Sequence, residues 1–164
     1  SDHYEHAVTM HGLSKTYGLP GLRLGWIVSR DLGVMRRIRK ERELFNCYVA
    51  PPVDFLARLA LRHEATILNR NSQLVRDNLE LATNFFARHD SLFRWRAPMA
   101  GVLSFPRWLG LGGTRVLSQQ LLERESLAFA PSYCFGAGDD HFRLSVSRRS
   151  FADGLERLEH FLAT

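Results

Sequence analysis

A glycine- and proline-rich loop between two apolar runs constrains the fold of this chain most strongly. The loop is HGLSKTYGLPGLRLGW, residues 11–26, with glycine or proline at Gly12, Gly18, Pro20, Gly21 and Gly25. The apolar runs at residues 7–10 and 22–28 predict a buried strand before the loop and another after it. Lys15 and Arg23 are therefore expected in a loop between two strands.

The residue types in this loop favour one chemistry. A lysine amine attacks a carbonyl only when it is unprotonated, so it needs a site that disfavours its charge or supplies a neighbouring cation, here Arg23. The guanidinium fork of Arg23 and the hydroxyl of Ser14 suit phosphate oxygens, and glycines let backbone amides approach an anion. Pyridoxal phosphate requires this combination, because it carries an aldehyde and a phosphate on one ring. The alternative is a flexible turn with a surface lysine and an arginine paired to a carboxylate.

Downstream patterns predict alternating helices and short strands. Asp31 is placed to cap a helix that NCYVAPPV interrupts, and Pro51 and Pro52 suit the first turn of a helix to about residue 63. A long helical pattern at residues 64–89 is expected to link two lobes. Strands are predicted at residues 93–96, 102–105, 127–130 and 142–146, and helices at residues 114–124 and 150–162. The order indicates an α/β layer arrangement.

Residues 12–25 resemble, over all fourteen positions, the cofactor-attachment signature of the class I/II aminotransferases, which are fold-type I enzymes dependent on pyridoxal phosphate. The resemblance implies that Lys15 forms the aldimine and shuttles the proton, and that Ser14 and Arg23 bind the phosphate. Many relatives carry a serine at the position of Gly12. A second segment, FAPSYCFGAGDDHFRLSVS at residues 129–147, resembles the family's late segment, which implies that Arg143 binds the substrate carboxylate.

The resemblance runs from about residue 6 to the last helix and implies the C-terminal part of a fold-type I enzyme of the α/β class. The expected divisions are residues 1–63, the end of the large cofactor-binding domain; residues 64–89, a connecting helix; and residues 90–164, a small α/β domain. In the family, the groups that contact the cofactor ring lie upstream of the lysine. The upstream half of the large domain is therefore expected to be missing, the fragment alone to be inactive, and its two strands to have unpaired edges.

The function implied by the resemblance is transfer of an amino group between an amino acid and a 2-oxo acid in amino-acid metabolism or biosynthesis. A homodimer is implied as well, because LFNCYVAPP lies where relatives approach the neighbouring subunit's active site. Two alternatives stay open. One is another reaction on the same scaffold, by a decarboxylase, a β-lyase or an amino-acid cyclase, and the other is a non-catalytic sensor domain of a transcription regulator.

Composition argues against several other classes of protein. The net charge is +5, but the one basic run, at residues 36–42, contains a glutamate and reads as a solvated helix face rather than a nucleic-acid surface. Two cysteines are too few to stabilise the domain through disulfide bonds, and they indicate a reduced, cytoplasmic setting. No apolar run reaches membrane length, and no metal site is expected, because His3, His6 and His11 straddle a predicted strand. The tryptophans are expected to be packing residues, and Tyr17 is either a pocket or a packing residue.

Overall fold

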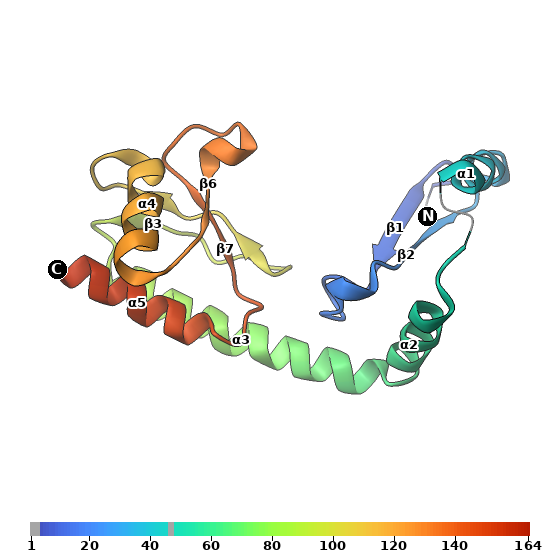
Figure 1. Ribbon diagram of the computed structural model, residues 1–164, viewed down its shortest axis with the longest axis horizontal. Helices are drawn as coiled ribbons and strands as arrows, with labels where there is room; N and C mark the ends of the chain where they lie inside the picture. Colours follow the sequence, from blue (N-terminus) through green and yellow to red (C-terminus); the bar gives the residue numbers. More distant parts are fainter. Residues whose placement is uncertain (1–3, 46–47) are drawn as a thin grey trace. The chain divides into compact units, whose positions relative to one another are not determined.

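The computed structural model describes residues 4–45 and 48–164 (Figure 1). The chain divides into two compact units, Ser1–Asn71 (unit 1) and Ser72–Thr164 (unit 2). The division falls inside the long helix α3 (Glu64–Arg88). Each unit combines strands with helices, so the expected α/β class is confirmed.

Unit 1 begins with an antiparallel pair of strands, β1 (Val8–Gly12) and β2 (Gly25–Ser29). Val8 lies opposite Ser29, and Gly12 lies opposite Gly25. The last position admits only glycine, because a Cβ on Gly25 would lie 2.5 Å from the carbonyl oxygen of His11. The sequence predicted both strands correctly, but the expectation that the first is buried is wrong. Val8 is 48% exposed and Met10 80% exposed, because in the described residues the two strands form a sheet without a third strand.

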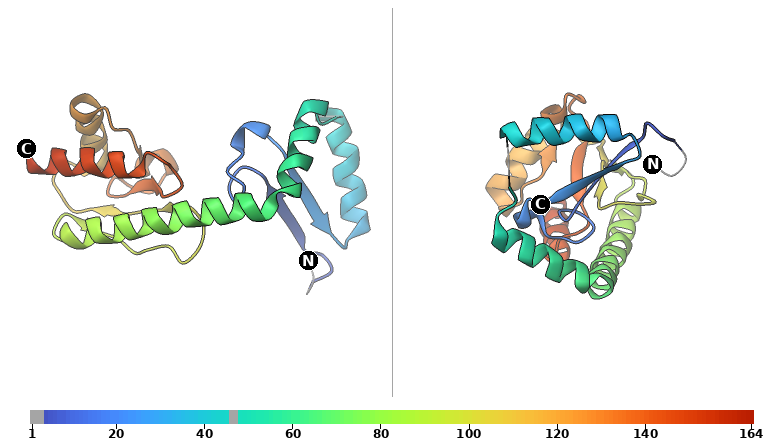
Figure 2. Two further views of the ribbon diagram at one scale, coloured as in Figure 1. Left: turned by 90° about the horizontal axis from the view of Figure 1, so that it is seen from below. Right: turned by 90° about the vertical axis from the view of Figure 1, so that its right-hand side faces the viewer.

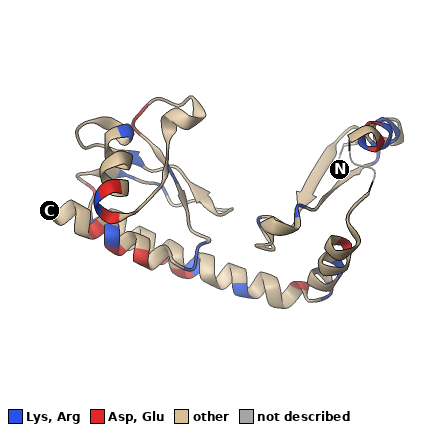
Figure 3. Ribbon diagram, viewed as in Figure 1, with Lys and Arg blue, Asp and Glu red and all other residues tan. Residues whose placement is uncertain are grey.

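Two helices follow the strands in unit 1. The helix α1 (Leu32–Phe45) begins after Asp31, whose Oδ1 accepts the Val34 N–H at 2.9 Å, so the predicted cap is confirmed. This hydrogen bond, together with that of His6, holds the pKa of Asp31 below its usual value. The basic residues of the run lie along α1 (Figure 3), and their side chains are exposed, as expected of a solvated face. The helix α2 (Pro51–Arg62) starts at the proline pair, as predicted.

Unit 2 is built on short antiparallel strands and three helical segments besides α3. The sheet order is β4-β7-β6, and β3 pairs with β5. The bounds are β3 (Phe93–Arg94), β4 (Leu103–Ser104), β5 (Arg107–Trp108), α4 (Gly113–Glu125), β6 (Ala130–Pro131), η2 (Ser132–Phe135), β7 (Phe142–Ser145) and α5 (Phe151–Ala163). In Figures 1 and 2, α5 lies alongside α3, where Arg88 and His89 both bond the carboxylate of Glu159, at 3.0 and 2.9 Å.

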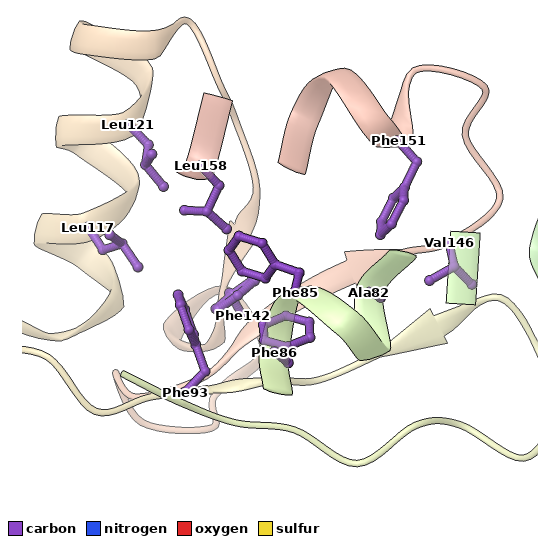
Figure 4. Packing of buried hydrophobic residues seen from close by; sticks show 10 residues of the cluster. All are labelled: Ala82, Phe85, Phe86, Phe93, Leu117, Leu121, Phe142, Val146, Phe151 and Leu158. Carbon is purple, nitrogen blue, oxygen red and sulfur yellow. The ribbon is translucent and has the colours of Figure 1, made fainter. Parts of the chain in front are cut away.

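The core of unit 2 lies between these helices and the strands (Figure 4). Side chains from α3, α4 and α5 converge on Phe93 and Phe142. Phe85 is 1% exposed, and its ring lies edge-on to Phe86 with centroids 5.3 Å apart. A buried amide ties α3 to the chain leaving β7, because Nδ2 of Asn78 donates to the carbonyl oxygens of Val146 at 2.9 Å and Arg148 at 2.8 Å.

The secondary-structure predictions for unit 2 were correct for the helices and incomplete for the strands. The strand expected at residues 127–130 begins only at Ala130, because Leu127 and Phe129 pack against the core from irregular chain. The strand β5 was not predicted. The packing role is confirmed for Trp95 and Trp108, whereas Trp26 is 37% exposed.

None of the helices in the described part of the chain combines the length and the apolar character that crossing a membrane requires. No group of three or more histidine, cysteine, aspartate or glutamate side chains is arranged among the described residues to hold a metal ion. His3 and Cys47 lie outside the described residues.

Candidate active site

The loop that joins β1 to β2 builds the site. Leu13 is fully buried, and its N–H donates to the carbonyl oxygen of Leu24 at 3.1 Å. This hydrogen bond extends the strand pairing one step beyond Gly12 and Gly25. Ser14 and Arg23 are the next residues on the two arms. The hydroxyl of Ser14 and the guanidinium of Arg23 are therefore attached to neighbouring positions of the hairpin backbone.

A pocket of about 400 Å³ opens at this loop. The residues that line it come from β1, the loop and β2; they are Met10, His11, Gly12, Ser14, Lys15, Thr16, Tyr17 and Trp26. The structure thus brings Ser14 and Lys15 to one pocket. Arg23 is not among the lining residues. It is exposed, and its guanidinium donates through Nη1 to the carbonyl oxygen of Pro20 at 3.1 Å.

Neither basic side chain of the loop is neutralised by a carboxylate of the described residues, whose ion pairs include no partner for Lys15 or Arg23. This excludes the alternative of an arginine paired to a carboxylate within this part of the chain. An amine without a counter-ion, a neighbouring hydroxyl and a guanidinium fork can bind a ligand that carries a carbonyl and an anionic group.

Arg23 occupies a strained backbone conformation. Its φ of 49° and ψ of 34° lie in the left-handed region, where it ends the short helix η1 (Pro20–Leu22). A side chain other than glycine adopts this region at a cost of about 1 kcal/mol or more. The position therefore holds an arginine where backbone conformation alone favours glycine.

The start of α3 holds the lysine loop in place. Nδ2 of Asn71 donates to the carbonyl oxygen of Thr16 at 2.9 Å. The hydroxyl of Tyr17 donates to Oε1 of Glu64 at 2.6 Å. This hydrogen bond, followed by burial and the charge of Glu64, raises the pKa of Tyr17. Tyr17 is 8% exposed and packs against Leu13, so it is both a packing residue and part of the pocket wall.

A stacked pair of rings forms a second part of the pocket wall and was not predicted from the sequence. His11 and Trp26 lie opposite each other in the strand pairing, with their rings stacked at 5.8 Å and 17° between planes. Both line the pocket. The sequence could have predicted this contact, because a strand pair with Gly12 opposite Gly25 also has His11 opposite Trp26.

Arg143 belongs to unit 2, on β7, opposite Ala130 of β6. Its side chain is exposed, and its guanidinium carbon lies 5.2 Å from the centroid of the Phe135 ring. No carboxylate of the described residues forms an ion pair with it. Arg148 and Arg149, which follow β7, are exposed as well.

Comparison with known proteins gives consistent matches. The family model described as aminotransferase class I and II matches residues 1–158. Capreomycidine synthase from Streptomyces vinaceus is 27% identical over 166 residues, which cover 100% of this chain and 42% of that protein. The chain therefore spans well under half of the length of such relatives.

Solved structures agree with this assignment. A PLP-dependent aminotransferase from Streptococcus suis superimposes with a TM-score of 0.89 at 28% identity, over 98% of this chain and 42% of that one. The PLP-dependent cyclase OrfR superimposes with a TM-score of 0.84 at 31% identity, over 95% of this chain and 43% of that one. These matches confirm the expected fold, the C-terminal part of a fold-type I enzyme.

Proposed function

This chain belongs to the class I and II aminotransferases, and we propose that it supplies the lysine-bearing part of an enzyme that transfers an amino group between an amino acid and a 2-oxo acid. The cofactor is pyridoxal phosphate. The observation that carries the proposal is the pocket that Lys15 shares with Ser14, in which the lysine has no carboxylate partner among the described residues.

The residues of the loop fit a ligand with an aldehyde at one end and a phosphate at the other. When bound, pyridoxal phosphate supplies a carbonyl that reacts with amines and a ring that accepts the electrons of a breaking α-bond. Lys15 would hold the cofactor at its aldehyde end, and its amine would move the proton at the substrate α-carbon. Ser14, and Arg23 after release from the Pro20 carbonyl oxygen, would hold the phosphate through a hydroxyl and a guanidinium fork. The His11–Trp26 stack forms a flat wall of the same pocket.

Arg143 binds the substrate carboxylate in this proposal. Two parallel N–H donors of a guanidinium match the two oxygens of a carboxylate. Its exposure, and the absence of an acidic partner in the described chain, leave these donors available.

Cyclisation of an amino acid is the second candidate. The observation in its favour is that the matched structure OrfR is a PLP-dependent cyclase, at 31% identity. The two reactions differ in the need for a second substrate. Amino-group exchange between an amino acid and a 2-oxo acid supports transamination, whereas conversion of an amino acid without any 2-oxo acid supports cyclisation.

The composition of the chain permits a sharp test of the lysine. Of its 22 basic residues, only Lys15 and Lys40 are lysines, and Lys40 is exposed on α1. After incubation with pyridoxal phosphate and reduction with borohydride, peptide mass spectrometry should find the cofactor on the Lys15 peptide. Lys15→Ala should abolish the label and the visible absorption of the bound cofactor, whereas Lys40→Ala should retain both. Equal labelling of both lysines would contradict the assignment.

The enzyme is further proposed to be a cytoplasmic homodimer. The low cysteine content supports a reducing compartment. The segment LFNCYVAPP, which by resemblance approaches the neighbouring subunit's active site, exposes two aromatic side chains: Phe45 is 87% and Tyr48 86% exposed, while Asn46 and Cys47 lie outside the described residues. Light scattering on the purified protein should give twice the protomer mass, and Phe45→Asp should lower it.

A further inference from the structure

Arg143 lies over an aromatic ring instead of beside a carboxylate. Its guanidinium carbon is 5.2 Å from the centroid of Phe135, the last residue of η2. A cation within about 6 Å of a ring centroid is attracted by the ring's negative face. Phe135 is 49% exposed, so burial alone does not explain an aromatic residue at this position.

Phe135 belongs to a row of three rings, in which Phe105 contacts both Phe135 and His141. Phe105 meets Phe135 edge-on, with centroids 6.2 Å apart and an angle of 75°. The ring of His141 stacks on Phe105, 5.2 Å from it and nearly parallel to it. Nδ1 of His141 is hydrogen-bonded to Asp140 at 2.7 Å. Phe135 is therefore linked to His141 through the ring of Phe105.

The backbone fixes the two partners relative to each other. The N–H of Ser132, at the start of η2, donates to the carbonyl oxygen of His141 at 2.7 Å, two residues before Arg143. Ser132 is fully buried, and its hydroxyl accepts the His141 N–H at 3.2 Å. Gly136 ends η2 with a φ of 70°, which turns the chain directly after the ring. Ser132 thus bonds the backbone of His141 through both its N–H and its hydroxyl, and these two bonds join the segment that carries Phe135 to the segment that carries Arg143.

An aromatic ring and a carboxylate can both restrain an arginine, but they have opposite effects on its ability to bind an anionic ligand. A carboxylate would accept the N–H bonds of the guanidinium and compete with an anionic ligand. The ring offers no lone-pair acceptor in the plane of the guanidinium, so the donors keep their capacity for a carboxylate. Ordering the side chain beforehand also lowers the entropy lost when a ligand binds.

We propose that Phe135 is a positioning residue for Arg143: its ring holds the guanidinium in the orientation that binds the carboxylate of an amino acid or 2-oxo acid. This inference rests on the assignment of Arg143 in the proposed function.

The same short helix contains a matched control. Arg115 lies over the ring of Tyr133 with its guanidinium carbon 3.9 Å from the centroid. Tyr133 is 39% exposed and belongs to η2, like Phe135. Removing this ring deletes an arginine–aromatic contact from the same element without touching Arg143.

The test compares Phe135→Leu, Phe135→Tyr, Tyr133→Leu and Arg143→Gln in the whole enzyme of which this chain is a part, purified and loaded with pyridoxal phosphate. The first measurement is the Kd of pyruvate, followed through the Nε–H signals of arginine in NMR spectra. The second is KM and kcat for transamination. Phe135→Leu should weaken pyruvate binding about twofold to fivefold, the range that an exposed cation–π contact provides, and should raise KM more than it lowers kcat. Phe135→Tyr and Tyr133→Leu should match the parent protein.

Several outcomes would overturn the inference. These are an unchanged Kd in Phe135→Leu, an equal loss in Tyr133→Leu, a loss that Phe135→Tyr does not restore, or an unchanged Kd in Arg143→Gln. Failure of the proposed function is separate, because it is read from the labelling of Lys15 and from transamination. If both are missing while Phe135→Leu still weakens pyruvate binding, the positioning role stands and the reaction assignment fails.

Discussion

The two units differ in how far they bury their own side chains. Unit 2 encloses a cluster of ten buried residues, five of which are phenylalanines. In unit 1 the corresponding cluster has three, Leu13, Tyr17 and Ala57. Because buried apolar area is the main source of stability, unit 2 is expected to be the more stable. The proposed lysine site therefore lies in the unit with fewer stabilising contacts.

The strand pair of unit 1 exposes apolar side chains on both faces. Residues that lie opposite each other share a face, and the faces alternate along each strand. Val8 and Met10 are exposed on one face, and Trp26 and Val28, at 37% and 46%, on the other. Exposed apolar surface on two sides of a sheet is typical of a strand pair that further chain covers. This comparison supports the proposal that the chain functions within a longer protein.

The largest effect is expected from the core of unit 2. Phe85→Ala should lower the free energy of unfolding of unit 2 by about 3 to 5 kcal/mol, because the cavity replaces contacts with three other aromatic rings. Hydrogen exchange read by mass spectrometry should show lost protection in peptides of unit 2. Leu32→Ala, at an exposed position of α1, should leave that protection unchanged. Equal loss of protection in both units would show that they unfold as one.

A similar change in unit 1 should have a smaller and more local effect. Leu13→Ala should cost about 2 kcal/mol, the lower end for a buried leucine, since few residues surround it. The lost protection should be confined to the hairpin, and the label on Lys15 after borohydride reduction should fall with it. Leu32→Ala, at a position that is 72% exposed, is the control. Global unfolding in Leu13→Ala would contradict the difference between the units.

The buried amide of unit 2 should rank next. Asn78→Ala leaves the carbonyl oxygens of Val146 and Arg148 without their donor, which should cost about 1 to 3 kcal/mol. Asn84→Ala removes the same side chain from an exposed position of α3 and should change stability by less than about 0.5 kcal/mol. Urea unfolding followed by the fluorescence of Trp95 and Trp108 measures both. Similar midpoints for the two variants would assign no role to the buried amide.

The smallest effect concerns Tyr17 and depends on pH. Because the pKa of Tyr17 is raised in the folded chain, its contribution is complete below the unfolded value of about 10 and is lost as the pH rises through the folded value. Tyr17→Phe should cost about 1 kcal/mol at pH 7, through the lost bond to Glu64. The difference from the parent protein should shrink above pH 10. A difference that stays constant up to pH 11, with exposed Tyr48→Phe as control, would contradict this account.

The sequence predicted the elements whose ends are encoded locally. Asp31 caps α1 and the proline pair starts α2, because each acts on a backbone only a few residues away. The strand β5 was missed, because two residues contain no periodicity and the strand is defined by its pairing with β3. Exposure of Val8 and Met10 was mispredicted for a related reason. An apolar run predicts burial, but burial depends on which neighbours the chain contains.

The contacts of the candidate site also include some that the sequence could predict and some that it could not. Ser14 and Lys15 are two adjacent residues of one loop, so their meeting in one pocket was predictable. The bond from Asn71 to Thr16 joins residues 55 positions apart, and the Phe135 ring over which Arg143 lies depends on the hydrogen bonds between Ser132 and His141. Such long-range contacts follow from tertiary structure and have no local signal.

The left-handed backbone at Arg23 has a consequence for protein engineering. A screen for thermostable variants should select glycine there, as it should at Ser126, whose φ is 52° at the end of α4. At Ser126 that exchange is expected to be harmless, but at Arg23 it would discard the guanidinium. In the proposed function Arg23 binds the phosphate, so thermal stability and phosphate affinity oppose each other at this position, which should be held fixed in any such library.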